Sequence, residues 1–407
     1  MFGSKKPVST DSAKIARILN HGVEDVFVRE SLDKKLKSGV RLRVKLGFDP
    51  TGSNIHIGRA ITLWKLRAFQ DLGHDIVFIV GDFTARIGDP SDKLEKRPML
   101  TTEAIKKNLR NYKEQVGKIV DMRRAQFFFN SAWLSKLTFE EVAQLAESFS
   151  VQQMSARRNF KDRIESGQEI SLREFLYPLM QGYDSVAVKA DVEIGGFDQL
   201  FNLKAGRTVQ KYFGMPEQDV LTTKMLVGTD GRKMSTSWGN VINITDTPAD
   251  MFGRIMSLRD DLIPAYFELC TTASEEELAR VAARLSGGEN PRDVKIDLGK
   301  AVVALYHGAA AAEKAANGFI ATFSDKKIPE DIQTATVARD VSLGDVLVEQ
   351  GIVASKTEFR RLIDSNAITN TDTGETITDS HLKISTPVTL QVGKRRFIKI
   401  LLGEHTQ

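Results

Sequence analysis

The sequence contains a single cysteine, Cys270, among 407 residues, so neither an internal disulfide nor a cysteine-built metal centre can form. It has no apolar run long enough to cross a membrane, and residues 1–10 lack the apolar core of a signal peptide. We therefore expect a cytoplasmic protein with no membrane-embedded segment. Any metal that the protein uses would arrive with a substrate.

An excess of charge of one sign is also missing, because 57 Lys and Arg residues oppose 53 Asp and Glu residues, which gives a net charge of +4. A nucleic-acid partner would therefore require basic residues that cluster locally. The length is too great for one compact core and indicates two to four domains. No internal repeat or low-complexity tract is evident.

Strand and helix patterns alternate from the start of the chain. Residues 43–48 form an apolar-rich run that ends in the turn residues 49–52, and a helix-period stretch follows at residues 57–72. A second buried strand is expected at residues 75–80. Further helices are expected at residues 102–120, 139–187 with an interruption near Gly167, and 197–213, and further strands at residues 126–129, 192–194 and 220–227. This order predicts an α/β fold, with a Rossmann-like parallel sheet and a helical insertion.

The composition changes after the last of these strands. The chain becomes helical and alanine-rich, with breaks at Gly287, Gly288 and Pro291, and a stretch of small polar residues then resembles a linker. The predicted division is a sheet domain with a helical insertion (1–228), a connecting loop (229–247), an α-helical domain (248–323), a linker (324–340) and a small α+β domain (341–407).

His56, Ile57, Gly58 and Arg59 lie where the first loop turns into a helix. Free backbone N–H groups and the positive end of the helix dipole can face a phosphate there, and glycine permits close approach. The alternative is a chance match, because at ordinary glycine usage the pattern His-x-Gly occurs about once in every two or three chains of this length.

A second short pattern, Lys233-Met234-Ser235-Thr236-Ser237, lies in a polar loop after the last strand. Its lysine and hydroxyls could clamp a charged leaving group, although a solvated basic turn has the same composition. The order of the two patterns, one opening the sheet and one following it, distinguishes them from chance. Together they resemble the ATP-binding signatures of class I aminoacyl-tRNA synthetases.

Four further segments narrow the resemblance to the tyrosyl-tRNA synthetases. They are Gly47-Phe48-Asp49-Pro50-Thr51, Gly88-Asp89-Pro90-Ser91, Tyr177-x-x-x-Gln181-x-x-Asp184, and Gly195-Gly196-Phe197-Asp198-Gln199. Their order and spacing match the active-site segments of that family. With the two signatures, the resemblance covers nearly all of the chain and implies ligation of tyrosine to its tRNA.

The spacing of Tyr177, Gln181 and Asp184 puts all three on one face of a helix, which could equally be a partly exposed surface. The resemblance assigns Asp184 to the phenolic hydroxyl of tyrosine, Tyr177, Gln181 and Asp89 to its ammonium group, and Gln199 to its carboxylate. The implied tyrosine-binding residues are Lys45, Asp89, Asn130, Tyr177, Gln181, Asp184 and Gln199.

ATP, carried with Mg²⁺, is the implied second substrate, and no protein-bound metal is expected. The residues implied to act on its reacting and leaving phosphates are Thr51, His56, Lys93, Arg97 and Lys233. The residues implied to bind ATP are Gly47, Asp49, His56, Gly58, Arg59, Gly196, Asp198, Lys233, Ser235 and Thr236. An exposed charged loop is the alternative explanation for Lys93 and Arg97.

The last domain resembles the ribosomal S-four-type RNA-binding fold. It is neutral overall, yet most of its basic residues fall in two short runs, which is typical of phosphate contacts. Ordinary solvated charge is the alternative. The implied tRNA-binding residues are Lys356, Arg360, Arg361, Lys394, Arg395 and Arg396. The resemblance also implies a homodimer formed through the helical insertion, around residues 149–164.

Four positions depart from the family pattern. Arg59 replaces the second histidine of the first signature, and Thr236 replaces the second lysine of the second. Lys45 stands where one branch of the family has a tyrosine that touches the substrate hydroxyl, and Phe197 replaces a small residue. Because of the departures at Arg59 and Thr236, the alternative that the protein is a non-catalytic RNA-binding relative of the family stays open. The sequence also leaves open a tryptophanyl enzyme and an adenylyltransferase of the His-x-Gly-His type.

Overall fold

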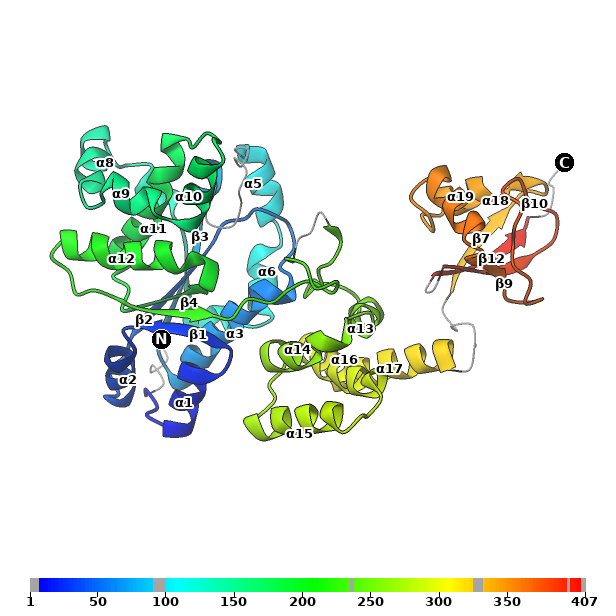
Figure 1. The fold of residues 1–407 in the computed structure, drawn as a ribbon, viewed down its shortest axis with the longest axis horizontal. Coiled ribbons are helices and arrows are strands. Elements are labelled where there is room, and N and C mark those ends of the chain that lie inside the picture. The colour runs from blue at the N-terminus through cyan, green and yellow to red at the C-terminus, as the bar shows by residue number, and fades with distance from the viewer. Residues whose placement is uncertain (1–6, 91–99, 235–237, 325–331, 394–395, 404–407) are drawn as a thin grey trace. The chain divides into compact units, whose positions relative to one another are not determined.

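The computed structural model describes residues 7–90, 100–234, 238–324, 332–393 and 396–403, and Figure 1 labels its elements. The chain divides into two compact units, Met1–Ala312 and Glu313–Gln407. In the described residues, the first unit contains a six-stranded sheet and the second contains a four-stranded and a two-stranded sheet, and each unit has its own buried apolar residues. Among the described residues, no helix combines the length and the apolar character that a membrane span requires.

A six-stranded sheet with the order β1-β6-β5-β2-β3-β4 forms the centre of the first unit. The strands are β1 Val23–Phe27, β2 Arg43–Phe48, β3 Asp75–Val80, β4 Ala125–Phe129, β5 Val192–Gly196 and β6 Asp219–Thr223. Every neighbouring pair is parallel except β1 and β6, which are antiparallel. The predicted α/β fold with a Rossmann-like sheet is thereby confirmed, and the antiparallel edge strand β1 is an addition that the sequence patterns did not predict.

Helix α3, Ile57–Leu72, shows why the first strand–loop–helix segment folds as it does. His56 caps its N-terminus, and Gly73 ends it in the left-handed conformation with φ +97°. Ala60, Leu63 and Leu66 are fully buried on one face. The remaining helices around this sheet are α1 Ser12–Asn20, α2 Arg29–Lys37, α4 Thr84–Ile87, α5 Thr102–Leu109, α6 Tyr112–Gly117, α7 Ser131–Leu134 and α12 Leu200–Tyr212.

The predicted helical insertion lies between β4 and β5 and gathers at one end of the unit (Figure 1). Its helices are α8 Phe139–Ala146, α9 Val151–Ser155, α10 Arg158–Glu165 and α11 Leu172–Val188. The expected break near Gly167 is present, and Gly167 has φ +69°. A buried ion pair between Arg163 and Glu174, with 2.7 Å between Nη1 and Oε1, joins α10 to α11 across this break.

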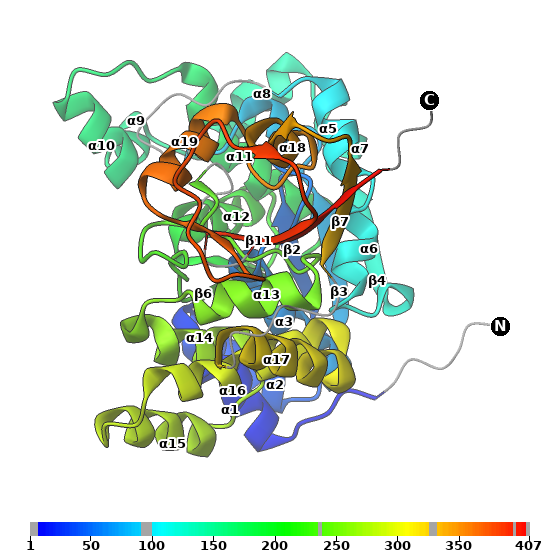
Figure 2. The same ribbon diagram turned by 90° about the vertical axis from the view of Figure 1, so that its right-hand side faces the viewer.

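A group of helices follows the sheet in sequence: α13 Pro248–Met256, α14 Ile263–Cys270, α15 Glu275–Ser286, α16 Pro291–His307 and α17 Ala309–Ser324. Helices α13, α14 and α16 lie side by side in both views (Figures 1 and 2). A hydrogen bond from Trp64 Nε1 to the Tyr306 hydroxyl, 3.1 Å long, joins α16 to α3. The predicted break at Gly287, Gly288 and Pro291 is confirmed, because α15 ends at Ser286 and Pro291 begins α16, as is usual for proline in a first turn.

The second unit contains β7 Gln333–Val337, β8 Val341–Ser342, α18 Leu343–Glu349, α19 Lys356–Asp364, β9 Ile368–Asn370, β10 Lys383–Ile384, β11 Val388–Val392 and β12 Arg396–Leu402. The predicted linker 324–340 is wrong at its C-terminal end, because β7 lies within it and pairs in parallel with β12. Small polar composition suggested a linker there, whereas the threonines and valine of β7 also suit a strand once a partner is present. The predicted helix 102–120 is divided into α5 and α6 by the turn at Arg110 and Asn111, and the predicted strand 220–227 ends early, at Thr223.

Candidate active site

The two signature segments meet at the start of α3. The backbone N–H of Ile57 donates to the Ile242 carbonyl at 2.8 Å, which anchors the chain that follows the second signature. A Cβ atom on Gly58 would lie 3.0 Å from Met234 Sδ, so the methionine of the second signature packs against the glycine of the first. Two segments more than 170 residues apart in the sequence thus form one site.

The imidazole of His56 is fixed as a neutral hydrogen-bond donor. Its Nδ1 accepts the backbone N–H of Arg59 at 3.3 Å, so the ring proton of a neutral imidazole must be on Nε2. Burial, followed by the positive charge of Arg59, lowers the pKa of His56 to about 3. At neutral pH, His56 can therefore donate a hydrogen bond to a phosphate but does not bring a charge.

Arg59, the residue that departs from the family pattern, reaches across the same loop. Its Nη2 donates to Thr51 Oγ1 at 2.7 Å, and its guanidinium lies over the ring of Phe48, 5.9 Å from the ring centroid. The structure therefore brings together Thr51, His56 and Arg59, which the sequence assigned to the phosphates. Arg59 supplies the positive charge that His56 lacks.

A buried carboxylate defines the opposite end of the site. Asp184 is 4 % exposed, and it accepts hydrogen bonds from Trp133 Nε1 at 2.7 Å and from Asn130 Nδ2 at 3.2 Å. Burial raises the pKa of Asp184 to about 6, against the opposing effects of Lys45 and of these two donors. Asn130 was among the residues implied by the resemblance, whereas Trp133 was missed.

Asp49 lies beside the residues assigned to tyrosine, although the resemblance placed it with ATP. Its Oδ2 accepts the hydroxyl of Tyr177 at 3.0 Å, and its Oδ1 accepts the hydroxyl of Thr84 at 2.7 Å. A Cβ on Gly81 would come within 1.9 Å of Asp49 Oδ1, so only glycine fits there. Burial and the neighbouring Asp49 raise the pKa of Tyr177, which keeps its hydroxyl protonated as a donor.

Asp89 and Gln199, assigned to the two charged groups of the amino acid, touch each other. Gln199 Nε2 donates to Asp89 Oδ2 at 2.7 Å, and Asn202 Nδ2 donates to Asp89 Oδ1 at 3.2 Å. Asn202 was missed from the sequence. Its position one helical turn after Gln199, at the start of α12, is a signal that could have identified it.

Gln181 and Lys45 both contact a further buried acid, Glu193, which was also missed from the sequence. Gln181 Nε2 lies 3.1 Å and Lys45 Nζ lies 2.9 Å from Glu193 Oε1. An acid in the middle of the apolar strand β5, opposite a lysine in β2, is an unusual pattern that could have indicated this pair. This contact fixes the side chain of Gln181 on α11, the helix that also carries Asp184.

The remaining predicted residues have varied positions. Asp198 and the lysine of the second signature, Lys233, are exposed. Gly47 is the last residue but one of β2 and Gly196 is the last residue of β5, so both lie at the carboxyl edge of the sheet. In the second unit, Arg360 and Arg361 are exposed on α19. Two other basic residues there form ion pairs, Lys356 with Asp345 at 2.5 Å and Arg396 with Glu358 at 2.9 Å. The predicted residues that lie outside the described ones are Lys93, Arg97, Ser235, Thr236, Lys394 and Arg395.

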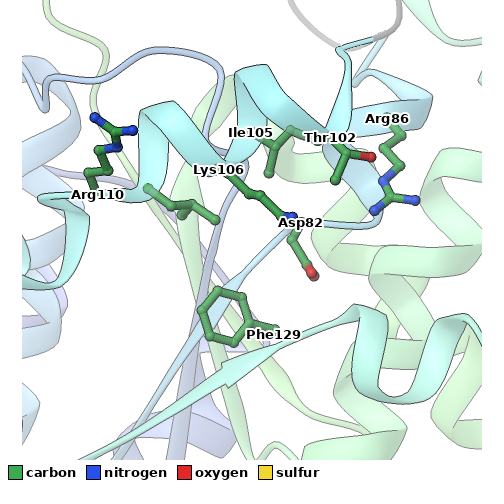
Figure 3. Close-up of a pocket in the computed structure, with 8 residues that line it drawn as sticks. Asp82, Arg86, Thr102, Ile105, Lys106, Arg110 and Phe129 are labelled. Atoms are coloured by element: carbon green, nitrogen blue, oxygen red, sulfur yellow. The ribbon is translucent and has the colours of Figure 1, made fainter.

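A pocket lies next to this site, beyond the carboxyl ends of β3 and β4 (Figure 3). It is lined by Asp82, Arg86, Thr102, Ile105, Lys106, Leu109, Arg110 and Phe129. None of these residues was predicted to bind substrate. Within the part of the chain that the structure describes, no three His, Cys, Asp or Glu side chains are grouped so as to hold a metal.

Comparisons with known proteins point in one direction. Residues 37–324 match the family model described as class I tRNA synthetases for tryptophan and tyrosine. The chain is 44% identical over 399 residues to a tyrosine–tRNA ligase of Carboxydothermus hydrogenoformans, which covers 94% of this chain and 97% of that protein. It is also 44% identical over 388 residues to tyrosine–tRNA ligase 2 of Vibrio vulnificus, with 95% and 98% covered.

Solved structures with a similar fold carry related names. A truncated mitochondrial tyrosyl-tRNA synthetase of Aspergillus nidulans superimposes with a TM-score of 0.64 at 22% identity, and 79% of this chain and 95% of that chain are covered. The tyrosyl-tRNA synthetase of Archaeoglobus fulgidus, solved with L-tyrosine, gives a TM-score of 0.60 at 22% identity, with 75% and 99% covered. At these identities the likeness concerns the fold.

Proposed function

The chain belongs to the bacterial-type tyrosyl-tRNA synthetases of class I, and from that premise we propose how its residues divide the work of activating tyrosine. The reaction is the ligation of tyrosine to its tRNA: tyrosine and ATP form tyrosyl-adenylate and pyrophosphate, and the tyrosyl group then passes to the tRNA. The single observation that supports the proposed tyrosine site best is the buried Asp184 carboxylate, held by Trp133 and Asn130.

Asp184 is the proposed partner of the substrate phenol. The indole N–H and the amide N–H orient its two oxygens, which leaves further acceptor capacity on the carboxylate for one hydroxyl. When phenylalanine enters, this buried carboxylate lacks that donor, and an unmet buried charge is costly. Tyrosyl enzymes are known to discriminate between tyrosine and phenylalanine in this way.

The amino-acid backbone is proposed to lie between Asp89 and Gln199. The Asp89 carboxylate would take the ammonium together with Tyr177 and Gln181, and the Gln199 carboxamide would donate to the substrate carboxylate. Since that carboxylate is already an anion, its attack on the α-phosphate needs no general base. Alignment and charge stabilisation then determine the rate of activation.

His56, Thr51 and Arg59 are the proposed phosphate contacts. His56 Nε2 and the N-terminus of α3 offer neutral donors, while Arg59 contributes a fixed positive charge. Mg²⁺ is proposed to enter with ATP, where it would neutralise charge on the β- and γ-phosphates. Lys233 would act on the departing pyrophosphate, and so would Lys93 and Arg97 from outside the described residues.

The second unit is the proposed reader of the tRNA, because α19 presents Arg360 and Arg361 to solvent beside one another. We propose the domain limits 1–228, 229–247 and 248–323 as expected from the sequence, with the linker shortened to 324–332 so that β7 belongs to the RNA-binding domain. The cytoplasm is the proposed compartment, because protein synthesis consumes the charged tRNA there.

A homodimer is proposed through the helical insertion. Several large apolar side chains on α8 to α11 are exposed, Phe139 by 90 %, Leu172 by 83 % and Val151 by 72 %. Exposed apolar groups of this size favour contact with another protein surface. A Leu172→Glu variant should then sediment as a monomer while the wild type sediments as a dimer; a monomeric wild type would refute the proposed assembly.

Amino-acid-dependent exchange of pyrophosphate into ATP, run with all twenty amino acids, tests the proposed site. We expect exchange with tyrosine and about a hundredfold or more weaker exchange with phenylalanine. A loss of this size is expected when a buried carboxylate is left without its hydrogen-bond donor. Exchange that requires tryptophan would refute the assignment of Asp184. Absence of exchange with every amino acid would favour a non-catalytic RNA-binding protein.

A further inference from the structure

A buried arginine lies beside the proposed tyrosine site without having been predicted there. Arg157 is 7 % exposed and precedes α10 in the helical insertion. Its guanidinium lies over two aromatic rings, 5.1 Å from the ring centroid of Phe160 and 4.4 Å from that of Phe201. Contacts of this kind hold a desolvated guanidinium in one orientation.

One hydrogen bond leads from this arginine into the site. Arg157 Nη2 donates to Asn202 Oδ1 at 3.1 Å, and Asn202 Nδ2 donates onward to Asp89 Oδ1 at 3.2 Å and to Gln199 Oε1 at 3.1 Å. Gln199 Nε2 donates in turn to Asp89 Oδ2 at 2.7 Å. We call Arg157, Asn202, Gln199 and Asp89 the amide relay.

Arg157 and Asp89, at the two ends of the amide relay, determine which group donates and which accepts in each of its hydrogen bonds. A guanidinium can only donate and a carboxylate can only accept, whereas each amide could be turned either way. Asn202 satisfies both neighbours only with its oxygen toward Arg157 and its nitrogen toward Asp89. Because that nitrogen also faces Gln199, the carboxamide of Gln199 turns its oxygen to Asn202 and its N–H groups toward Asp89.

We propose that Arg157 is a positioning residue that, through Asn202, fixes the Gln199 carboxamide with its N–H groups facing the carboxylate of bound tyrosine. The inference rests on the proposed function, since it takes Asp89 and Gln199 as the groups that bind the amino-acid backbone. Gln199 has two N–H groups, one for Asp89 and one for the substrate. A reversed amide would present an oxygen to that carboxylate, and two acceptors repel each other.

Arg157 remains a cation at neutral pH, although burial lowers its pKa to about 10. The amide relay therefore keeps its direction across the pH range in which the enzyme can be assayed. Its second consequence is electrostatic, because a buried positive charge stands near Asp89 and offsets part of the cost of burying that carboxylate.

Steady-state pyrophosphate exchange by the full-length protein separates the roles of the amide relay members. Arg157→Met should raise the KM for tyrosine about tenfold, the effect of losing one well-oriented charged hydrogen bond, with the KM for ATP unchanged. Arg157→Lys, which keeps an obligate donor, should remain within about threefold of the wild type. Asn202→Asp should be worse than Asn202→Ala, since a carboxylate cannot donate to Asp89 or Gln199.

Tyrosinol provides a probe of direction, because it keeps the phenol and the ammonium of tyrosine but lacks the carboxylate. Its inhibition constant should rise less in Arg157→Met than the KM for tyrosine rises. The double variant Arg157→Met with Asn202→Ala should be no worse than Asn202→Ala alone, because Arg157 acts through that amide.

Arg163→Met is the matched control, since Arg163 is another buried arginine of the same insertion but pairs with Glu174. It should lower the melting temperature and leave the KM for tyrosine unchanged. The inference is overturned if Arg157→Met leaves the KM for tyrosine unchanged, if Arg163→Met raises it equally, or if the effects at Arg157 and Asn202 multiply. A wild-type protein without tyrosine-dependent exchange would instead overturn the proposed function.

Discussion

The ammonium of Lys45 and the carboxylate of Glu193 form an ion pair 2.9 Å long, with both side chains almost completely buried. The two residues face each other in register across the parallel strands β2 and β5. Lys45 also donates to the Ser185 hydroxyl at 2.8 Å and to the Gln181 carbonyl at 2.9 Å. Three acceptors match the three donors of an ammonium.

The predicted contact of Lys45 with tyrosine is therefore better described as indirect. The lysine connects the sheet to α11, the helix that carries Gln181 and Asp184, and so supports the part of the candidate site that these two residues form. Its positive charge opposes the rise in the pKa of Asp184 that burial causes. A tyrosine in this position could not form the same pair, which explains why the departure from one branch of the family is accompanied by a buried acid.

Lys45→Met should destabilise the first unit by about 3–5 kcal/mol, because it leaves Glu193 charged and buried without its partner. Lys45→Met combined with Glu193→Gln should recover part of that loss, since the amide keeps hydrogen-bonding capacity without the charge. Melting temperatures from calorimetry at pH 7.5 would rank the variants. A double variant no more stable than Lys45→Met would contradict the assigned role of the ion pair.

His56→Ala should lower the maximal rate of pyrophosphate exchange by about 10²–10³, the usual effect of removing one donor to a reacting phosphate. Tyrosine binding, measured by equilibrium dialysis, should remain close to wild type because His56 is a proposed contact of the phosphates and not of tyrosine. His381→Ala provides the control, as His381 is exposed in the second unit. A loss of tyrosine affinity equal to the loss of rate would argue that His56 supports the fold of the whole site.

Much of the fold could be predicted because local signals agreed with one another. The strands at 43–48 and 75–80 and the helix at 57–72 have the predicted bounds, since each combines an apolar pattern with turn or capping residues at its ends. β1 and β7 were missed for a different reason. Their sequences alternate weakly, and their strand conformation depends on pairing with β6 and β12, which are distant in sequence.

The sequence indicated residues that we propose to contact a ligand, but it did not indicate residues that contact one another inside the candidate site. Asn130 and Asp184 came from the resemblance, but Trp133, Glu193, Arg157 and Asn202 belong to networks whose partners lie up to about 150 positions away in the chain. Most of these contacts leave no local pattern in the sequence. Two signals could have been used, which are the pairing of charges inside apolar strands, as at Lys45 and Glu193, and the position of Asn202 one helical turn after Gln199.

Selectivity for tyrosine should decrease at acid pH. The pKa of Asp184 is raised to about 6 by burial, so the carboxylate that we propose to bind the phenol is mostly protonated below that pH. The kcat/KM for tyrosine should fall about tenfold per pH unit below pH 6, while that for phenylalanine changes little. Exchange assays from pH 5 to 8 would show it, and an Asp184→Asn variant should lack this pH dependence.

The same pKa shift has a consequence for stability. The native pKa of Asp184 lies above that of an unfolded aspartate, so the native state binds more protons between about pH 4 and pH 6. The contribution of this residue to stability is therefore present below that interval and is lost as the pH rises through it.

The selectivity prediction has its own contradicting outcome. If the ratio of kcat/KM for tyrosine to that for phenylalanine stays constant from pH 5 to pH 8, Asp184 does not titrate in this range.

Charge reversal on α19 should separate tRNA recognition from adenylate formation. Phe359 and Ile363 bury one side of this helix, which leaves Arg360 and Arg361 exposed, so replacing both with glutamate should not disturb the core. Each lost phosphate contact should weaken tRNA binding. It should also reduce the slope of the logarithm of the binding constant against the logarithm of the salt concentration by about one unit. We expect the KM for tRNA in aminoacylation to rise at least tenfold while pyrophosphate exchange stays unchanged.

Point variants are preferable to a truncation in this experiment, because β7 pairs with β12 and a cut at Val341 would leave an unpaired strand on the rest of the chain. Lys383→Glu, an exposed reversal on β10 of the same unit, controls for the general effect of added negative charge. If it raises the KM for tRNA as much as the α19 variant, the effect comes from net charge. If neither variant changes the KM, tRNA is recognised elsewhere, and the second unit has another role.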